Sequence, residues 1–125
     1  MPALVEALVR AGRSPEAEPL VLPFEAVAVA SGRPLLLGLA RRMRGLVDGS
    51  TEQVESSVAI LAAAGNRYEQ ARSELLLGEA RRRERQRGAA RVALRSAIAG
   101  FESAGATPWA ERARSVRQAV CDALS

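Results

Sequence analysis

The stretch GNRYEQARSELLLG, residues 65–78, decides the fold. Gly65 breaks the preceding pattern, and Asn66 stands three residues before Glu69, which is typical of the start of a helix. The small and apolar residues that follow recur every three or four positions along one stripe: Tyr68, Ala71, Leu75 and Gly78. This spacing predicts an amphipathic helix that buries one face.

Segments of the same kind fill the rest of the chain, separated by Gly, Pro and short polar breaks. We expect about seven helices: Pro2–Ala11, a second between Ser14 and Gly32, Pro34–Val47, a fourth between Ser50 and Gly65, a fifth from Asn66 to about Gln86, a sixth between Gly88 and Gly105, and a seventh after Thr107. We expect the second helix to be kinked or to start late, because Pro19 and Pro23 each remove a backbone donor. The short loops predict antiparallel hairpins in one domain, 1–125.

Helix starts also carry capping sequences. Ser14 and Thr107 stand as caps before Pro15 and Pro108, and proline fits the first helical turn. Ser50 with Gln53 forms a predicted capping box, in which the hydroxyl accepts a first-turn amide and the Gln side chain reaches back to the cap.

Glycines recur at a fixed interval. Gly12, Gly45 and Gly78 are each 33 residues apart, and Gly32 and Gly65 share that interval. A tetratricopeptide unit repeats about every 34 residues, with a small residue where its first helix crosses its second. Two helices approach closely only where a side chain is missing, so a glycine fits the crossing.

The second helix of each expected unit carries a ladder of apolar positions. Counting 12, 16 and 19 residues on from Gly78 gives Ala90, Leu94 and Ala97, and the same count from Gly45 gives Ser57, Leu61 and Ala64. Phe101 and Trp109 continue the apolar stripes of the sixth and seventh helices. The predicted fold is therefore all-α, with tetratricopeptide-like antiparallel helix hairpins stacked as a short right-handed solenoid.

Composition narrows the function. The chain has 125 residues, no His, one Cys and a net charge of +4. Without His, the commonest general base and metal ligand is missing, and neither a Ser nor Cys121 has such a partner, so we expect no enzyme and no cofactor. No apolar run approaches the roughly 20 residues of a membrane span, and Glu6 and Arg10 interrupt any signal peptide, so we expect a cytoplasmic protein.

The densest charge lies in one short run: Arg81, Arg82, Arg83, Arg85 and Arg87. Such a run can contact phosphates or a partner, but cations at the end of a helix are also favoured by its dipole, and no aromatic residue interleaves the run to stack bases. Trp109 likewise has two interpretations, as a ligand-stacking residue or as part of the core, and its spacing with Ala113 and Val116 favours the core.

The stretch from Gly65 to Arg114 resembles the last helical repeats of large ATP-binding LuxR-type transcriptional regulators, which are common in actinobacteria. The most specific parts are Arg67-Tyr68-Glu69 and Pro108-Trp109-Ala110-Glu111-Arg112, and Leu4 to Gly12 also fits the pattern. In that family a nucleotide-hydrolysing domain precedes the array and a helix-turn-helix follows it. The resemblance implies a module that links the binding of a partner or inducer to transcription.

Two departures separate the chain from a whole regulator. A chain without Lys has no Gly-x-x-x-x-Gly-Lys loop for ATP phosphates, and too little sequence follows the Trp109 helix for a DNA-reading domain. We expect either a fragment or remnant of a regulator or a free-standing repeat protein. Its function would be non-enzymatic interaction or coupling, and the alternative is a small basic helical protein that binds nucleic acid directly.

Partners follow from these expectations. A protein partner or a small inducer would meet the concave face of the array. The apolar stripe of the last helix, from Trp109 to Val120, has no following helix to cover it, so we expect self-association there.

Overall fold

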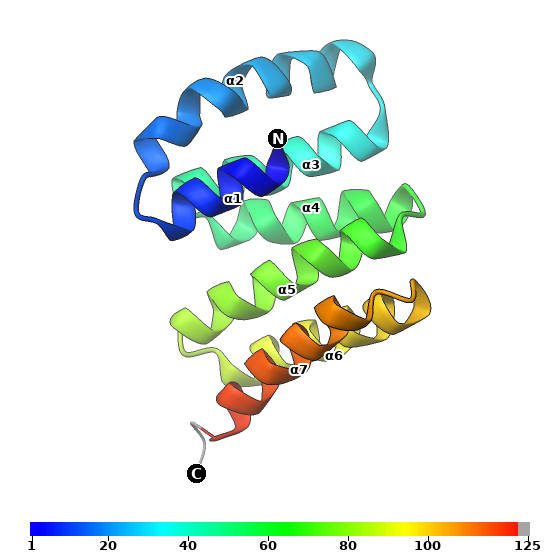
Figure 1. The fold of residues 1–125 in the computed structure, drawn as a ribbon. Coiled ribbons are helices and arrows are strands. Elements are labelled where there is room, and N and C mark those ends of the chain that lie inside the picture. The colour runs from blue at the N-terminus through cyan, green and yellow to red at the C-terminus, as the bar shows by residue number, and fades with distance from the viewer. Residues whose placement is uncertain (123–125) are drawn as a thin grey trace. The chain divides into compact units, whose positions relative to one another are not determined.

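The computed structural model describes residues 1–122 and is all-helical over that range, as predicted (Figure 1). Its helices are α1 (Pro2–Arg10), α2 (Ser14–Ser31), α3 (Pro34–Asp48), α4 (Thr51–Ala63), α5 (Arg67–Arg83), α6 (Arg87–Ser103) and α7 (Thr107–Asp122). The chain divides into two compact units, Met1–Ala64 and Gly65–Ser125. The stacking of the units as one solenoid domain stays a prediction.

The first unit is built on the hairpin of α3 and α4, with α1 and α2 packed against α3. One cluster of its core consists of the fully buried Val5, Ala17, Val21 and Met43. Phe24 from α2 is half-buried against this cluster. Most core side chains are small or medium-sized, so the helices must approach closely to exclude water.

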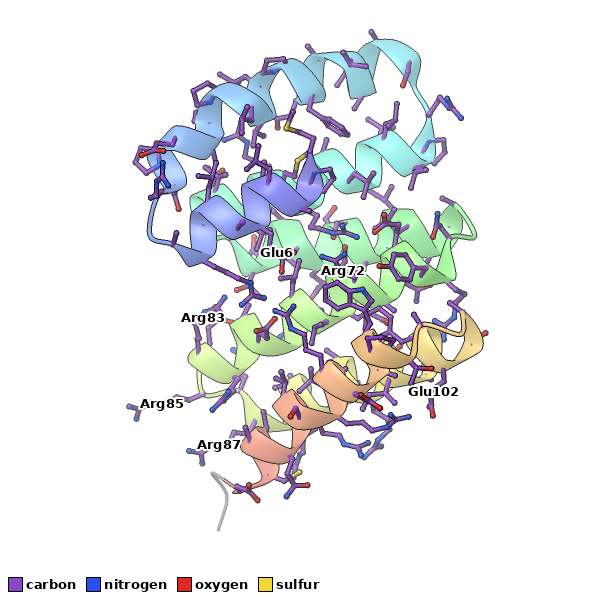
Figure 2. The ribbon with its side chains drawn as sticks, in the orientation of Figure 1. Glu6, Arg72, Arg83, Arg85, Arg87 and Glu102 are labelled. Atoms are coloured by element: carbon purple, nitrogen blue, oxygen red, sulfur yellow. The ribbon has the colours of Figure 1, made fainter. Side chains whose placement is uncertain are left out.

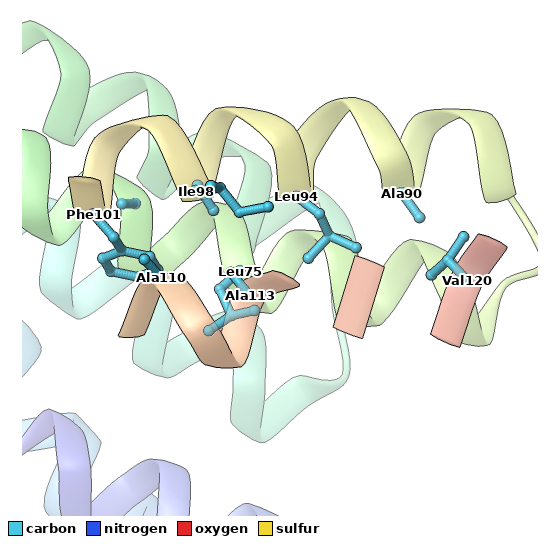
Figure 3. Close-up of a cluster of buried hydrophobic side chains, with 10 residues drawn as sticks. Leu75, Ala90, Leu94, Ile98, Phe101, Ala110, Ala113 and Val120 are labelled. Carbon is cyan, nitrogen blue, oxygen red and sulfur yellow. The ribbon is translucent and has the colours of Figure 1, made fainter. Parts of the chain in front are cut away.

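The second unit packs α6 between α5 and α7. Phe101, Leu94 and Leu75 are its largest fully or almost fully buried side chains (Figure 3). Tyr68 meets Phe101 edge to face with ring centroids 6.0 Å apart, and Trp109 stacks on Phe101 with centroids 5.9 Å apart. Three of the four aromatic residues of the chain therefore belong to this core.

Helix α2 runs without a break from Ser14 to Ser31, so the expected late start is wrong. The prolines are tolerated because Pro15, Pro19 and Pro23 all lie on the exposed side, four residues apart. Pro15 is in the first turn, where no such hydrogen bond is made. Pro19 and Pro23 each lack the N–H that would bond the carbonyl four residues earlier, and on this side water can satisfy that carbonyl.

The exposed side of α2 is also apolar. Leu22 and Val27 are 55% and 60% exposed. We call the following exposed residues the proline stripe: Pro15, Pro19, Leu22, Pro23, Ala26 and Ala30. Helix α2 thus carries apolar residues both toward the core and toward solvent.

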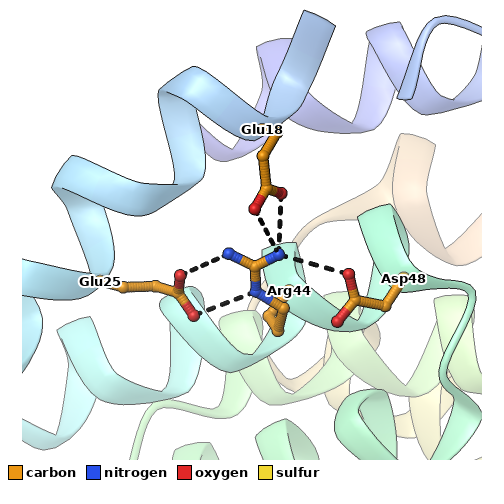
Figure 4. A network of polar contacts seen from close by, with 4 residues as sticks. All are labelled: Glu18, Glu25, Arg44 and Asp48. Atoms are coloured by element: carbon orange, nitrogen blue, oxygen red, sulfur yellow. Dashed lines mark hydrogen bonds and ion pairs between the residues drawn. The ribbon is translucent and has the colours of Figure 1, made fainter. Parts of the chain in front are cut away.

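An arginine fixes α2 to α3 (Figure 4). Arg44 on α3 bonds Glu25 at 2.6 Å and Glu18 at 2.8 Å, both on α2, and Asp48 at 3.3 Å on its own helix. The guanidinium is 17% exposed, and its hydrogen bonds to Glu25 and then Glu18 raise the pKa of Arg44 above the ordinary value. The cation therefore holds one flank of α2 while the proline stripe stays free.

Two of the predicted caps are confirmed in part. Ser50 Oγ accepts from Gln53 N–H at 3.3 Å, and Asn66 Oδ1 accepts from Glu69 N–H at 3.0 Å. The reach-back of Gln53 is not made, because the Ser50 amide already donates to the Gly45 carbonyl at 2.9 Å and closes α3. Gln53 Oε1 has no hydrogen-bond partner among the described residues.

The other two helix starts differ from the expectation. Arg13, not Ser14, is the N-cap of α2, and no side chain caps that end. Helix α7 already includes Thr107, so Pro108 stands one residue further into its first turn. In both cases proline occupies the first turn as expected, and the helix simply begins one residue earlier than the hydroxyl predicts.

The glycine crossings correct the predicted repeat. An ideal Cβ on Gly78 would lie 2.6 Å from Cγ and Cδ2 of Leu94, and a Cβ on Gly38 would lie equally close to Leu61. Gly45 is also closely packed, but against Val54 at 2.8 Å, one turn before the α3–α4 loop. Leu61 and Leu94 are thus equivalent, whereas the counterpart of Gly78 is Gly38.

The ladder counted from Gly45 holds at two of its three positions. Ser57 and Leu61 are fully buried, but Ala64 is exposed and lies just beyond the end of α4. Helices α5 and α6 each have 17 residues, whereas α3 has 15 and α4 has 13. The same sequence interval therefore falls at different distances from the loop in the two hairpins.

We predict that Gly78→Ala destabilises the second unit by about 1–3 kcal/mol, because Leu94 is fully buried and has no room to move from the added methyl group. The control is Gly88→Ala in the first turn of α6, where an added Cβ meets nothing within 4 Å. Alanine should leave the control equally or more stable. Urea denaturation followed by circular dichroism measures both, and equal midpoints for the two variants would contradict the tight crossing.

Candidate functional site

The five arginines singled out in the sequence lie around the turn between α5 and α6, which we call the arginine loop, residues 81–87. Arg81, Arg82 and Arg83 form the last turn of α5, and Arg87 is the first residue of α6. All are exposed except Arg81, which is half-buried. Figure 2 shows Arg83, Arg85 and Arg87 projecting from this end of the hairpin.

Arg85 has an unusual backbone. Its φ is +61°, in the left-handed region that side chains disfavour by about 1 kcal/mol or more. The amide of Arg85 donates to the Arg82 carbonyl at 3.0 Å, and the amide of Gln86 donates to the Arg81 carbonyl at 2.8 Å. A loop that needs a left-handed residue therefore carries a cation instead of glycine at its tip.

Two other helix connections have the same hydrogen-bond pattern with glycine in that position. Gly12 donates to the Val9 carbonyl at 3.0 Å, and Gly105 donates to the Glu102 carbonyl at 3.1 Å. Their φ values are +74° and +70°. The comparison shows that the loop geometry is the ordinary one, and that only the residue at the tip is different.

The arginine loop contains more basic than acidic residues. Glu84 is its sole acidic residue, and Arg81 Nη1 donates to Gln86 Oε1 at 3.0 Å. The negative end of the α5 dipole lies here and favours cations. Guanidinium groups bind phosphate and carboxylate oxygens through paired N–H donors, so this loop can contact an anionic surface.

Trp109 lies half-buried on the core of the second unit. The Arg72 guanidinium stands 3.9 Å from the ring centroid and that of Arg112 stands 5.1 Å from it. The ring is thus packed between Phe101 and two cations, which agrees with the interpretation of Trp109 as a packing residue rather than a ligand platform.

The stripe on α7 does not lie open. Ala113 and Val120 are fully buried, and Val116 packs on the same cluster with α6 residues such as Leu94. The reason given for self-association through the last helix therefore does not hold, because α6 already covers that stripe. Leu124 and its neighbours at 123 and 125 lie outside the described residues.

The other predicted repeat positions are core residues. Ala90, Leu94, Ala97 and Phe101 are fully buried on α6, and Tyr68 is half-buried beside them. None of these side chains carries chemistry, and they act by packing.

Three further findings concern metal sites, membrane-spanning helices and the cysteine of the described residues. Between residues 1 and 122 no three His, Cys, Asp or Glu residues gather where they could hold a metal ion. No helix in that range has the length and apolar character needed to cross a membrane. Cys121 is a half-buried free thiol.

Sequence reasoning missed two features. The Arg44 cluster joins residues 19 and 26 positions apart, and such long-range pairs leave no local pattern. The proline stripe was missed because the prolines were interpreted as helix breakers, although their spacing of four residues is itself the signal of one helix face.

Comparison with models of protein families gives no match, and comparison with curated proteins and with solved structures gives none either. The resemblance to LuxR-type regulators therefore stays a prediction.

We predict that Arg85→Gly stabilises the second unit by about 1 kcal/mol, because glycine adopts φ +61° without steric strain. The control is Arg83→Gly, which places glycine inside the last turn of α5 and should destabilise by up to about 1 kcal/mol. Thermal unfolding of both variants gives the comparison. A lower melting temperature for Arg85→Gly would mean that the Arg85 side chain makes contacts that outweigh the strain.

Proposed function

We propose that the chain is a non-enzymatic helical-repeat module that binds another protein, resembling the coupling array of a LuxR-type transcriptional regulator. The observation that carries this proposal is the proline stripe on α2. Exposed apolar patches on a helix are typical of protein–protein interfaces. Binding a partner removes this apolar surface from water, and that removal contributes free energy to the association. The largest exposed apolar side chains on or beside the stripe are Leu22, Val27 and Val29, which are 55%, 60% and 73% exposed.

The construction of the first unit supports the proposal. Arg44 and the buried Ala17 and Val21 fix the inner side of α2, so its outer side is presented on a rigid helix. A fixed helix face loses little conformational entropy on binding. The regulatory role, the inducer and the cytoplasmic setting are parts of the same proposal and rest on the resemblance.

We predict that the product of a coding sequence adjoining this one, an ATPase or a helix-turn-helix protein, co-purifies with the chain through the proline stripe. A Leu22→Glu, Val27→Glu double variant should lose the complex, because two carboxylates would be desolvated in an apolar contact. The matched control is the Leu4→Glu, Val92→Glu double variant, which adds the same charge at exposed apolar residues outside α2, 50% and 68% exposed. Undiminished binding by the Leu22→Glu, Val27→Glu variant would refute the stripe as the binding face.

The alternative function is direct binding of nucleic acid, and the exposed cations of the arginine loop favour it. Phosphate contacts need accessible guanidinium groups, and Arg82, Arg83, Arg85 and Arg87 are all exposed. The loop has no aromatic residue to stack bases, so any binding would follow the phosphate backbone and show little sequence preference.

We predict that fluorescence anisotropy with a labelled duplex at low salt separates this alternative from a merely solvated loop. If the loop binds, changing Arg82, Arg83, Arg85 and Arg87 to Gln should weaken binding at least about tenfold and flatten the salt dependence. The control changes four exposed arginines elsewhere, Arg13, Arg41, Arg67 and Arg95, to Gln and so removes the same charge. Equal losses in both variants would point to net charge alone, and no binding by the unchanged chain would remove the alternative.

A further inference from the structure

The net positive charge of the chain lies in its second unit. Residues 1–64 contain six arginines and seven acidic residues, whereas residues 65–125 contain twelve arginines and seven acidic residues, a net charge of +5. Six of these arginines make no side-chain hydrogen bond or ion pair with any residue between 1 and 122: Arg82, Arg83, Arg85, Arg87, Arg91 and Arg95. The excess charge is therefore concentrated on the arginine loop and on α6.

A role in the fold does not account for all of these cations. Arg44, by contrast, is held by carboxylates of α2 and α3. The dipole of α5 stabilises Arg82 and Arg83, because they lie in its last turns. Arg87 lies in the first turn of α6, where the dipole disfavours a cation, and no acidic residue of that turn compensates it. The fold alone thus gives no reason for a cation at position 87.

Three of the six arginines are aligned along α6. We call Arg87, Arg91 and Arg95 the arginine row. They are four residues apart, so each step advances about 6 Å along the helix axis and turns by about 40°. Arg87 and Arg95 are exposed, and Arg91 is half-buried. The row begins at the end of the hairpin from which Arg83, Arg85 and Arg87 project (Figure 2).

We propose that the arginine row binds an acidic segment of a partner protein, in which carboxylates recur at every second residue of an extended chain. Alternate side chains of an extended chain point to one side about 6.6 Å apart, so three of them span about 13 Å. The three positions of the row span about 12 Å along α6. Guanidinium and carboxylate groups at matched spacing form paired, charge-assisted hydrogen bonds. This surface lies on the second unit and does not depend on the proline stripe.

The residues beside the row favour a polypeptide over a nucleic acid. The exposed neighbours on α6 are uncharged and have no hydrogen-bonding side chain: Gly88, Val92 and Ala99. Val92 is 68% exposed. Apolar side chains of a polypeptide can pack against Val92, whereas a phosphate backbone presents none. Residues 81–95 also include no aromatic side chain on which a base could stack.

Exposed ion pairs of this kind are weak and screened by salt. For three such pairs we expect a dissociation constant of about 0.1–1 mM at about 20 mM salt, rising at least about fivefold at about 200 mM salt. The other cations of the arginine loop attract the acidic segment at longer range and raise its association rate.

Two labelled peptides of equal composition test the spacing. The first, Ser-Glu-Ser-Glu-Ser-Glu-Ser, places Glu at every second position, and the second, Glu-Ser-Ser-Glu-Ser-Ser-Glu, places it at every third. Both have blocked termini and the same charge. Only the first presents its three carboxylates on one side at the spacing of the row, so it should bind at least about fivefold more tightly in microscale thermophoresis at low salt.

A row variant, with Gln at all three positions of the arginine row, should bind the alternating peptide at least about tenfold more weakly. The control variant changes Arg33, Arg67 and Arg117 to Gln. These three side chains also make no ion pair within residues 1–122, so the control removes the same charge, and its affinity should fall less than about threefold. Circular dichroism verifies that both variants are folded.

Charge exchange tests direct contact at the centre of the row. Arg91→Glu should bind the alternating peptide more weakly than the unchanged chain does, and it should prefer a peptide whose central Glu is replaced by Lys. A field of net charge alone predicts no such preference for the central position.

Thermal unfolding tests the premise that the row does not serve stability. Arg87→Gln alone should melt at the same temperature as the unchanged chain or higher, because it removes a cation from the positive end of α6. A lower melting temperature would assign Arg87 to the fold and overturn that premise.

Several results would overturn the proposal itself: no binding of the alternating peptide, equal affinity for both peptides, or equal losses in the row and control variants. A row variant that loses a labelled DNA duplex but keeps the peptide would assign the row to nucleic acid instead. The Leu22→Glu, Val27→Glu variant should keep its peptide affinity within about twofold, because those residues lie on α2. Failure of the stripe experiment therefore leaves the arginine row untouched, and the reverse also holds.

Discussion

The close approach of paired helices at glycine is the constraint on which the rest of the structure depends. A Cβ on Gly78 or Gly38 would lie 2.6 Å from a buried leucine of the facing helix. With only four aromatic residues in the chain, the cores consist mainly of Ala, Val and Leu, and such side chains exclude water only when helix axes are close. The absence of a side chain at these crossings is what lets small residues make a dry interior.

Much of the fold could be predicted from local sequence, because its signals are local. Glycine ends α2 and α4, polar caps begin α4 and α5, and the apolar spacing identifies the buried faces of α5 and α6. The register of the hairpins could not be predicted, because it depends on helix length and loop position together. Counting from Gly45 therefore reached the exposed Ala64, although the count from Gly78 led to buried residues.

Only part of the candidate site could be predicted from the sequence, because some of its features have a local sequence signal and others do not. The exposure of the arginine loop follows from its position after the apolar stripe of α5. The left-handed conformation of Arg85 leaves no signal in the sequence, because the residue type expected there is glycine. The proline stripe required knowing which side of α2 faces solvent, and that side is decided by Arg44 and by the core of the first unit. The two units thus carry surfaces of different chemistry, one apolar and one cationic.

The position of Trp109 has a spectroscopic consequence. The chain has a single Trp and a single Tyr, and both lie in the second unit, beside Phe101. Intrinsic fluorescence therefore reports the unfolding of that unit alone, and the nearby Arg72, 3.9 Å from the ring centroid, makes the emission sensitive to the loss of local packing. Far-ultraviolet circular dichroism reports the helices of both units. Comparing the two signals during unfolding measures how strongly the units cooperate, without any label or mutation.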